Sequence, residues 1–334
     1  MSFKDNKRIA IVDLWRFVWI VVIMCHHIPL TGIGVSKLPF ADMGWICADF
    51  FFVLTGYLTY KHFEETSSKG DFDQTCRYLV RKYKVIFPYS VISVIACYVI
   101  EALRLKEYGL KTVIGSFFDL PVELFYLKLE GKSIVVWFLT SMLIVFPIFL
   151  LILQIRSNSV IALISFSLSA AYYVLDNNES INTVYTLFRA MAGLLLGAFI
   201  GSILPLVIIP YLKDKNRKML TAAEVLFMMA PIIITALNIK VPRVLLMLLL
   251  FFGLSIMLSG FSRTAQIDSG ILTRLGAISL PIFLLHPIII RLFGYLSDVK
   301  ALRIVPAEVV VLYFFFTFVL SAVVYRIVNG KRNR

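Results

Sequence analysis

The chain has 334 residues, of which 60% are apolar and 16% charged, and its mean hydropathy is +0.87. A soluble globular protein is about half apolar and about a quarter charged. This composition therefore excludes a soluble globular protein. The net charge of +13 does not indicate nucleic-acid binding, because no soluble basic segment is long enough to form a domain. We therefore expect a single membrane domain over residues 1–334, with no appended soluble domain and no nucleic-acid partner.

Apolar runs of about 20 residues, the length that crosses a bilayer, recur along the whole chain. They predict an all-α integral membrane protein with about ten transmembrane helices, near residues 9–31, 43–60, 84–103, 134–155, 158–175, 184–211, 219–238, 244–261, 274–295 and 305–328. Pro205 and Pro210 are expected to break the end of the sixth helix. The segment 112–126 is too interrupted to span, which favours a re-entrant or amphipathic segment in the membrane interface.

The first run differs from a signal peptide, because it carries Asp13, Arg16 and two histidines and has no small-residue cleavage site. We expect it to be retained as the first span. With the N-terminus in the cytoplasm, about 20 Lys and Arg residues fall in inner loops and about 10 in outer loops. This difference predicts that both termini are cytoplasmic and that residues 176–182 lie outside.

The cysteines lie in or beside apolar runs and form no C-x-x-C pair. We expect free thiols at Cys25, Cys47, Cys76 and Cys97, with no disulfide and no cysteine metal site. No H-E-x-x-H pattern is present in the sequence, and we expect no metal and no bound cofactor.

Ionisable side chains inside the first span are functional candidates, because each costs a few kcal/mol in hydrocarbon. Arg16 and His27 lie on one helix face, within about 20° of each other and about 16 Å apart along the axis. They would contact different parts of a long ligand, and the imidazole of His27 suits proton transfer near neutral pH. Asp13 shares the face, and an Asp13–Arg16 ion pair that only stabilises packing is equally compatible with the spacing. His26 is turned by about 100° and is expected to point elsewhere.

Counting along the other spans places Asp49 at a depth similar to that of His27, Trp137 and Arg189 in the outer half of the membrane, and His286 near mid-depth. We expect one polar pocket that gathers them with His27, in which Asp49 orients the imidazole. Structural roles stay open for two of them. Arg189 could pair with a carboxylate across the bundle, and His286 could be a buried histidine with its hydrogen bonds satisfied.

The first two spans resemble acyltransferase family 3, which comprises membrane O-acyltransferases that modify bacterial surface polysaccharides, peptidoglycan and related glycans. The R-x10-H signature of that family is matched by Arg16 and His27, with Asp13 and Leu14 in its lead-in. Its D-L-F-F-V-L-S-G-F-L block is similar to the segment 49–58, DFFFVLTGYL.

Later blocks of the family are matched in the same order, so that the resemblance covers nearly the whole chain. The matched residues are Arg81, Pro88 and Tyr89 around the start of the third span, Trp137, Phe138 and Leu139 on the fourth, Arg189, Gly193 and Gly197 on the sixth, and Ser279 and His286 on the ninth. Leu280 and Phe283 replace the tyrosines usual in the last block.

The resemblance implies an enzyme of the bacterial inner membrane that transfers an acetyl or similar acyl group from acyl-CoA, as co-substrate, to a sugar hydroxyl. The acceptor would be a surface polysaccharide or a lipid-linked glycan. Such a transfer needs a base at the hydroxyl and donors for the developing oxyanion. We expect His27 to be the base, with Asp49 fixing its tautomer. An acyl-imidazole intermediate on His27 is a variant of the same mechanism.

The donor's phosphates are expected to contact the basic loop 61–84, through Arg81 and Lys82, with Arg16 deeper in the membrane. The same charges equally serve topology alone. Trp137, Arg189 and His286 are expected to complete the substrate site.

A transporter or flippase for a glycan or small solute is the alternative function, because buried Arg, His and Asp on about ten spans are equally natural there. An acyltransferase that acts on a lipid-linked glycan at the cytoplasmic face is a third possibility. The sequence gives no indication of the oligomeric state.

Overall fold

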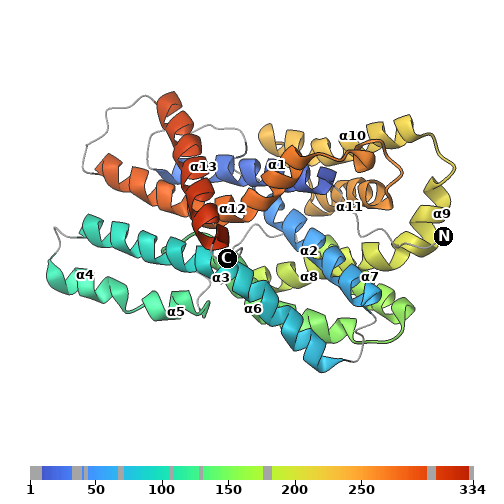
Figure 1. The fold of residues 1–334 in the computed structure, drawn as a ribbon, viewed down its shortest axis with the longest axis horizontal. Helices are drawn as coiled ribbons and strands as arrows, with labels where there is room; N and C mark the ends of the chain where they lie inside the picture. Colours follow the sequence, from blue (N-terminus) through green and yellow to red (C-terminus); the bar gives the residue numbers. More distant parts are fainter. Residues whose placement is uncertain are drawn as a thin grey trace.

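The computed structural model describes residues 10–31, 40, 44–66, 71–105, 109–127, 131–175, 183–298 and 306–330. Every regular element in these ranges is a helix (Figure 1). The long helices are α1 (Ala10–His27), α2 (Ile46–Glu65), α3 (Phe72–Leu105), α6 (Val136–Leu153), α7 (Asn158–Leu175), α8 (Thr183–Ile203), α10 (Arg217–Ala236), α11 (Arg243–Ser259), α12 (Gly270–Asp298) and α13 (Pro306–Gly330).

These long helices coincide with the predicted spans. Eight helical stretches in the described part of the chain are long and apolar enough to cross a membrane. The other two predicted spans correspond to α2, which carries the buried Asp49, and to α11, which is an apolar helix of 17 residues. The prediction of an all-α integral membrane protein is confirmed. The predicted orientation places the termini in the cytoplasm and residues 176–182 outside. These segments lie outside the described residues, so the orientation stays a prediction.

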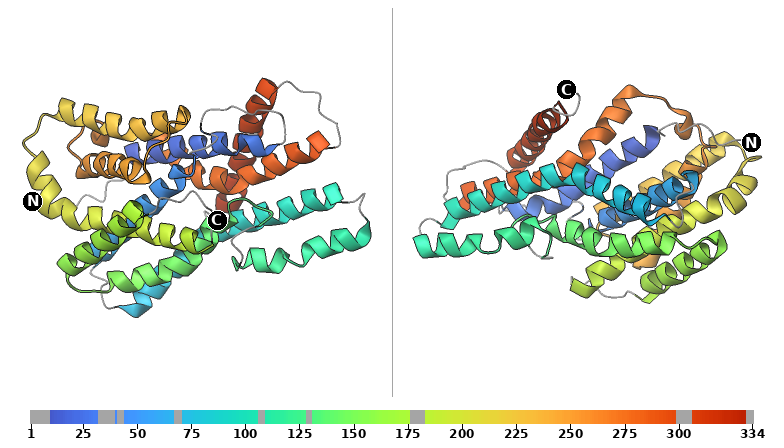
Figure 2. Two further views of the ribbon diagram at one scale, coloured as in Figure 1. Left: turned by 180° about the vertical axis from the view of Figure 1, so that it is seen from behind. Right: turned by 60° about the horizontal axis from the view of Figure 1, so that its bottom comes forward.

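Two short helices, α4 (Leu110–Phe117) and α5 (Leu120–Leu124), occupy the segment that was expected not to span. They contact the C-terminal half of α3 (Figure 2). Leu110, Phe118 and Phe125 expose between 65% and 77% of their surface, as expected for a segment that contacts lipid.

The prediction of a basic loop over residues 61–84 is wrong, because most of these residues are helical. Helix α2 continues to Glu65, and α3 begins at Phe72 and has 34 residues. Arg81 and Lys82 therefore lie on α3 and not in a loop. A hydropathy window detects only the apolar part of a helix, whereas the polar first turns of α3 carry no such signal.

Helices α2 and α8 pack closely because glycines let their backbones approach. A Cβ atom on Gly56 would collide with the carbonyl oxygen of Leu194, and one on Gly197 with that of Val53. Contacts of this kind are typical of helix pairs in membranes. The two helices run in the same direction, since Asp49 contacts Arg189 near their N-terminal ends and Gly201 lies against Tyr60 near the other end.

Helix α1 packs against α12 and crosses α2. Trp19 stacks on Phe50 of α2 with ring centroids 5.4 Å apart. Asp13 lies against Gly276 of α12, where a Cβ atom would collide with the carboxylate. Gly44, just before α2, lies against His26, so α1 runs antiparallel to α2 and its C-terminal end meets the N-terminal end of α2.

The end of α8 is broken as expected. The α-helix stops at Ile203, a π-helical turn covers Leu204–Ile208, and α9 (Ile209–Leu212) follows. Pro205 lies in the turn, where its missing N–H group interrupts the regular hydrogen bonds.

Candidate active site

Two histidines from distant parts of the chain meet at the C-terminal end of α1. Nδ1 of His27 lies 3.0 Å from Nε2 of His286 on α12, and the two rings are stacked with centroids 5.1 Å apart. His286 is fully buried, whereas His27 is partly buried. His27 therefore has one face toward the protein core and remains accessible to a ligand.

His286 is itself held by its own helix. Its second ring nitrogen, Nδ1, lies 3.2 Å from the carbonyl oxygen of Ile282, one turn earlier. The ring also contacts Phe283, whose centroid is 6.1 Å away. Prolines at 281 and 287 flank this turn of α12, and a proline within a helix removes a backbone hydrogen bond.

His26 contacts a different part of the molecule, as the helical spacing predicts. Its Nδ1 lies 3.1 Å from the carbonyl oxygen of Phe40, and Gly44 packs on its side chain. Because a carbonyl oxygen only accepts, His26 donates this hydrogen bond. Its contacts fix the chain just before α2.

Asp49 does not contact His27, and the expected arrangement of these two residues is wrong. The carboxylate of Asp49 accepts two hydrogen bonds from Arg189, with Nε–Oδ1 at 2.8 Å and Nη2–Oδ2 at 3.0 Å. Arg189 also donates to the carbonyl oxygen of Trp45. Asp49 is 0% exposed and Arg189 8%, so this is a buried bidentate ion pair. The pairing of Arg189 with a carboxylate across the bundle is the alternative that the sequence left open.

The guanidinium of Arg189 is enclosed by aromatic rings. Its Cζ lies 5.4 Å from the ring centroid of Trp45 and 5.7 Å from that of Trp137, both within the range of cation–π contacts. Trp137 lies in the first turn of α6, and the structure brings this predicted residue to Arg189. A row of aromatic contacts then runs from Trp137 through Phe138 and Phe283 to His286.

Sequence reasoning missed two contributors to this region. Arg243, at the start of α11, lies 4.2 Å from the ring centroid of Trp45 and donates a hydrogen bond of 3.1 Å to the hydroxyl of Tyr172. Both Trp45 and Arg243 lie at the edges of apolar runs, where Trp and Arg are common as interfacial anchors. Composition therefore gave no signal that separated them from ordinary boundary residues.

Arg16 lies away from the histidine pair, on the far side of the Trp19–Phe50 contact. Its Nη1 is 3.6 Å from Oδ1 of Asp13, one turn earlier on α1. The ion pair predicted as an alternative is therefore formed. It does not exclude a ligand, because the side chain of Arg16 is 32% exposed.

Arg81 and Lys82 lie at the opposite end of α2 from Asp49. The Nζ atom of Lys82 is 5.2 Å from the ring centroid of Tyr78, which stacks on His62 in the last turn of α2. His62 follows Asp49 by 13 positions, or about 20 Å along a helix. The predicted residues thus form two groups at opposite ends of the bundle, with Arg16 between them along α1.

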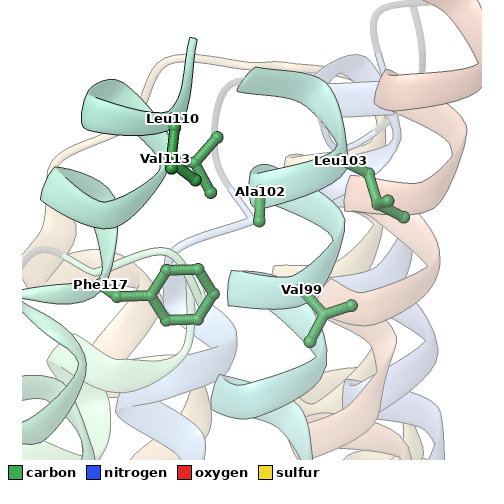
Figure 3. A pocket seen from close by; sticks show the side chains of 6 residues that line it. All are labelled: Val99, Ala102, Leu103, Leu110, Val113 and Phe117. Atoms are coloured by element: carbon green, nitrogen blue, oxygen red, sulfur yellow. The ribbon is translucent and has the colours of Figure 1, made fainter. Parts of the chain in front are cut away.

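The described residues include no group of three or more His, Cys, Asp or Glu side chains that could hold a metal ion. All four cysteines are free thiols. A groove of about 480 Å³ between α3 and α4 holds none of the predicted site residues, and all the side chains that line it are apolar (Figure 3). It is lined by Val99, Ala102, Leu103, Leu110, Val113 and Phe117.

The fold and these residues define a polytopic membrane protein with a buried polar site made of imidazole, guanidinium and carboxylate groups. Residues 9–326 match the model of the acyltransferase domain family, acyltransferase family 3, and the chain belongs to it. The chain is therefore a membrane acyltransferase. The comparisons with curated proteins and with solved structures give no significant match.

Proposed function

We propose that this acyltransferase moves an acetyl or similar acyl group from acyl-CoA to a sugar hydroxyl of a surface polysaccharide or lipid-linked glycan, in the bacterial inner membrane. The observation that carries the proposal is the position of His27. Its imidazole is partly buried, lies against a second imidazole, and shares a face of α1 with Arg16. A base at one end of the bundle can activate a hydroxyl, and cations toward the other end can bind the phosphates of a long anionic thioester.

In the proposed reaction, His27 accepts the proton of the sugar hydroxyl as the hydroxyl oxygen attacks the thioester carbonyl. The tetrahedral intermediate carries a negative oxygen and collapses with cleavage of the carbon–sulfur bond. The CoA thiolate leaves and receives the proton from the imidazolium of His27, which restores the neutral base. General-base catalysis of this kind contributes about 10²- to 10⁴-fold in rate.

The two ends of the bundle suit the two ends of the donor. Arg81 and Lys82 offer cations for the phosphate groups of CoA, and arginine and lysine are the usual partners of phosphates. Arg16 lies about 16 Å from His27 along α1 and could contact the donor between its phosphates and its thioester. The helical position of Arg81 and Lys82 supports this role, because α3 fixes them beside the end of α2.

The acceptor sugar is assigned to the end that holds Trp137 and Arg189. The charge of Arg189 is neutralised by Asp49, so the guanidinium can hold a neutral polyhydroxyl group without a strong preference for anions. Aromatic rings with a polar edge, such as that of Trp137, provide apolar surface and a hydrogen-bond donor together. Asp49 then acts by holding Arg189 in place.

The proposal is tested with the purified protein in lipid nanodiscs, supplied with radiolabelled acetyl-CoA and glycan from a strain that lacks the gene. We expect release of the CoA thiol and label in the glycan, and loss of both in His27→Ala. Mass spectrometry of glycans from the deletion strain and its parent then identifies the acylated sugar. Solute flux in proteoliposomes without thioester cleavage would instead support a transporter and overturn the proposal.

A further inference from the structure

The hydrogen bonds around His286 determine which of its nitrogens carries a proton. Nδ1 of His286 lies 3.2 Å from the carbonyl oxygen of Ile282. A carbonyl oxygen can only accept a hydrogen bond, so Nδ1 must be the protonated nitrogen. In a neutral imidazole only one nitrogen carries hydrogen, and Nε2 of His286 is therefore left with a lone pair.

A doubly protonated His286 would have no compensation for its charge. The side chain is 0% exposed, and its hydrogen-bond and ring contacts in the described structure are with His27, with Phe283 and with the backbone of its own helix. A buried charge is strongly unfavourable unless a group of opposite charge pairs with it. The neutral form, with Nε2 as an acceptor, is the one that this environment stabilises.

The state of His286 then fixes the state of His27. Since Nε2 of His286 is an acceptor, the 3.0 Å contact requires that Nδ1 of His27 carries the hydrogen and donates it. The lone pair of neutral His27 is consequently at Nε2. Within the described residues, that nitrogen has no hydrogen-bond partner, so it is the one that can accept a proton from a ligand.

We propose that His286 is a positioning residue that holds His27 in the tautomer with its basic nitrogen at Nε2, through the chain Ile282 C=O, His286, His27. The inference rests on the proposed function of His27 as the general base. An orienting group on the other nitrogen of a catalytic histidine is a recurring arrangement, and it usually is a carboxylate. Here a neutral imidazole takes that place, and Asp49, which sequence reasoning assigned to it, holds Arg189 instead.

Two amide substitutions test whether His27 needs a hydrogen-bond acceptor at the position of Nε2 of His286. In His286→Gln, the amide oxygen reaches the position of Nε2 and can still accept from His27. In His286→Asn, the shorter side chain places its amide near the position of Nδ1 and leaves His27 without an acceptor. Both variants bury one neutral amide in the same cavity, and the melting temperatures of the purified variants measure the effect of the methylene group by which they differ.

We expect His286→Gln to retain most activity, and His286→Asn to lose about 10²-fold in kcat, the lower end of what a general base contributes. The KM for acyl-CoA should stay unchanged in both, because in this proposal His286 acts on His27 and not on the donor, in place of the substrate contact that the sequence predicts for it. Equal activity of the two variants, after normalisation for folded protein, would overturn the proposal.

A spectroscopic measurement tests the tautomer without reference to activity. The chain contains four histidines, so 15N-histidine labelling of the whole protein gives a spectrum that single substitutions can assign. We expect a pyrrole-type signal for Nδ1 of His27 and a pyridine-type signal for Nε2, in the parent and in His286→Gln. The reverse pattern in the parent would overturn the proposal even if His27→Ala is inactive. Full activity of His27→Ala would instead contradict the base itself and leave the tautomer assignment untouched.

Discussion

Asp49 and Arg189 form a buried bidentate ion pair between the N-terminal ends of α2 and α8. The two helices meet along glycines that allow their backbones to touch. A close backbone contact along the helices and an ion pair at one end therefore belong to the same interface. This interface positions Trp45 and Trp137. Trp137 in turn begins the row of aromatic contacts that runs through Phe138 and Phe283 to His286.

Removing both partners of this ion pair should cost less stability than the sum of the two single removals. Asp49→Asn leaves the charge of Arg189 buried, and Arg189→Gln leaves that of Asp49 buried. Breaking a buried pair in this way costs about 3–5 kcal/mol. The double variant Asp49→Asn/Arg189→Gln should lose less than the sum of the two. Thermal unfolding of the detergent-purified variants, followed by size-exclusion chromatography, measures this, and additive losses would contradict the prediction.

The glycine contact between α2 and α8 predicts a stability effect of its own. Gly197→Ala forces a methyl group against the carbonyl oxygen of Val53, and overpacking of this kind costs about 1–3 kcal/mol. Gly294→Ala on α12 is the matched control, since its Cβ would meet no atom within 4 Å. Alanine is the better helix former by about 1 kcal/mol, so the control should be neutral or stabilised. A lower melting temperature in the control than in Gly197→Ala would contradict this account.

The spans could be predicted from the sequence because the thickness of the bilayer sets the length of each apolar run. The contact of Asp49 could not, because counting along a span gives depth but not the direction that a side chain faces. Asp49, His27 and Arg189 all lie at the same end of the bundle. The packing of α2 on α8 determines that Asp49 contacts Arg189 and not His27. The glycines at 193, 197 and 201, spaced by four, were the signal for that packing.

The sequence predicted that His27 and His286 line the same pocket, but not that their side chains contact each other. The two residues are 259 positions apart, and no local pattern encodes which of the pocket residues touch. Their hydrogen bond depends on how α1 packs on α12 and on the turn of α12 between Pro281 and Pro287. Such angular details come from packing between helices, which a single sequence does not display.

Arg81 and Lys82 are predicted to contribute to donor binding more than to chemistry. The variant Arg81→Ala/Lys82→Ala should raise the KM for acyl-CoA while it changes kcat little, because a contact remote from the reacting atoms binds substrate and transition state equally. Lys218→Ala removes an exposed cation from the start of α10 and serves as the control. Steady-state kinetics of thiol release measure both constants. An unchanged KM in the double variant would leave these cations with a role in topology alone.

The two adjacent histidines give the sharpest comparison, because helix geometry separates side chains of identical chemistry. His27 faces His286, whereas His26 donates to the carbonyl oxygen of Phe40. If His27 is the base, His27→Ala should lose about 10²- to 10⁴-fold in kcat while its folded fraction changes little.

His26→Ala should retain most activity and lose about 0.5–1.5 kcal/mol of stability, the net contribution of one hydrogen bond. Acetylation assays on membranes normalised for protein abundance, combined with melting temperatures of the purified variants, separate the two effects. Full activity in His27→Ala would end the proposed mechanism. Loss of activity in His26→Ala alone, with its melting temperature unchanged, would assign the base to the other imidazole.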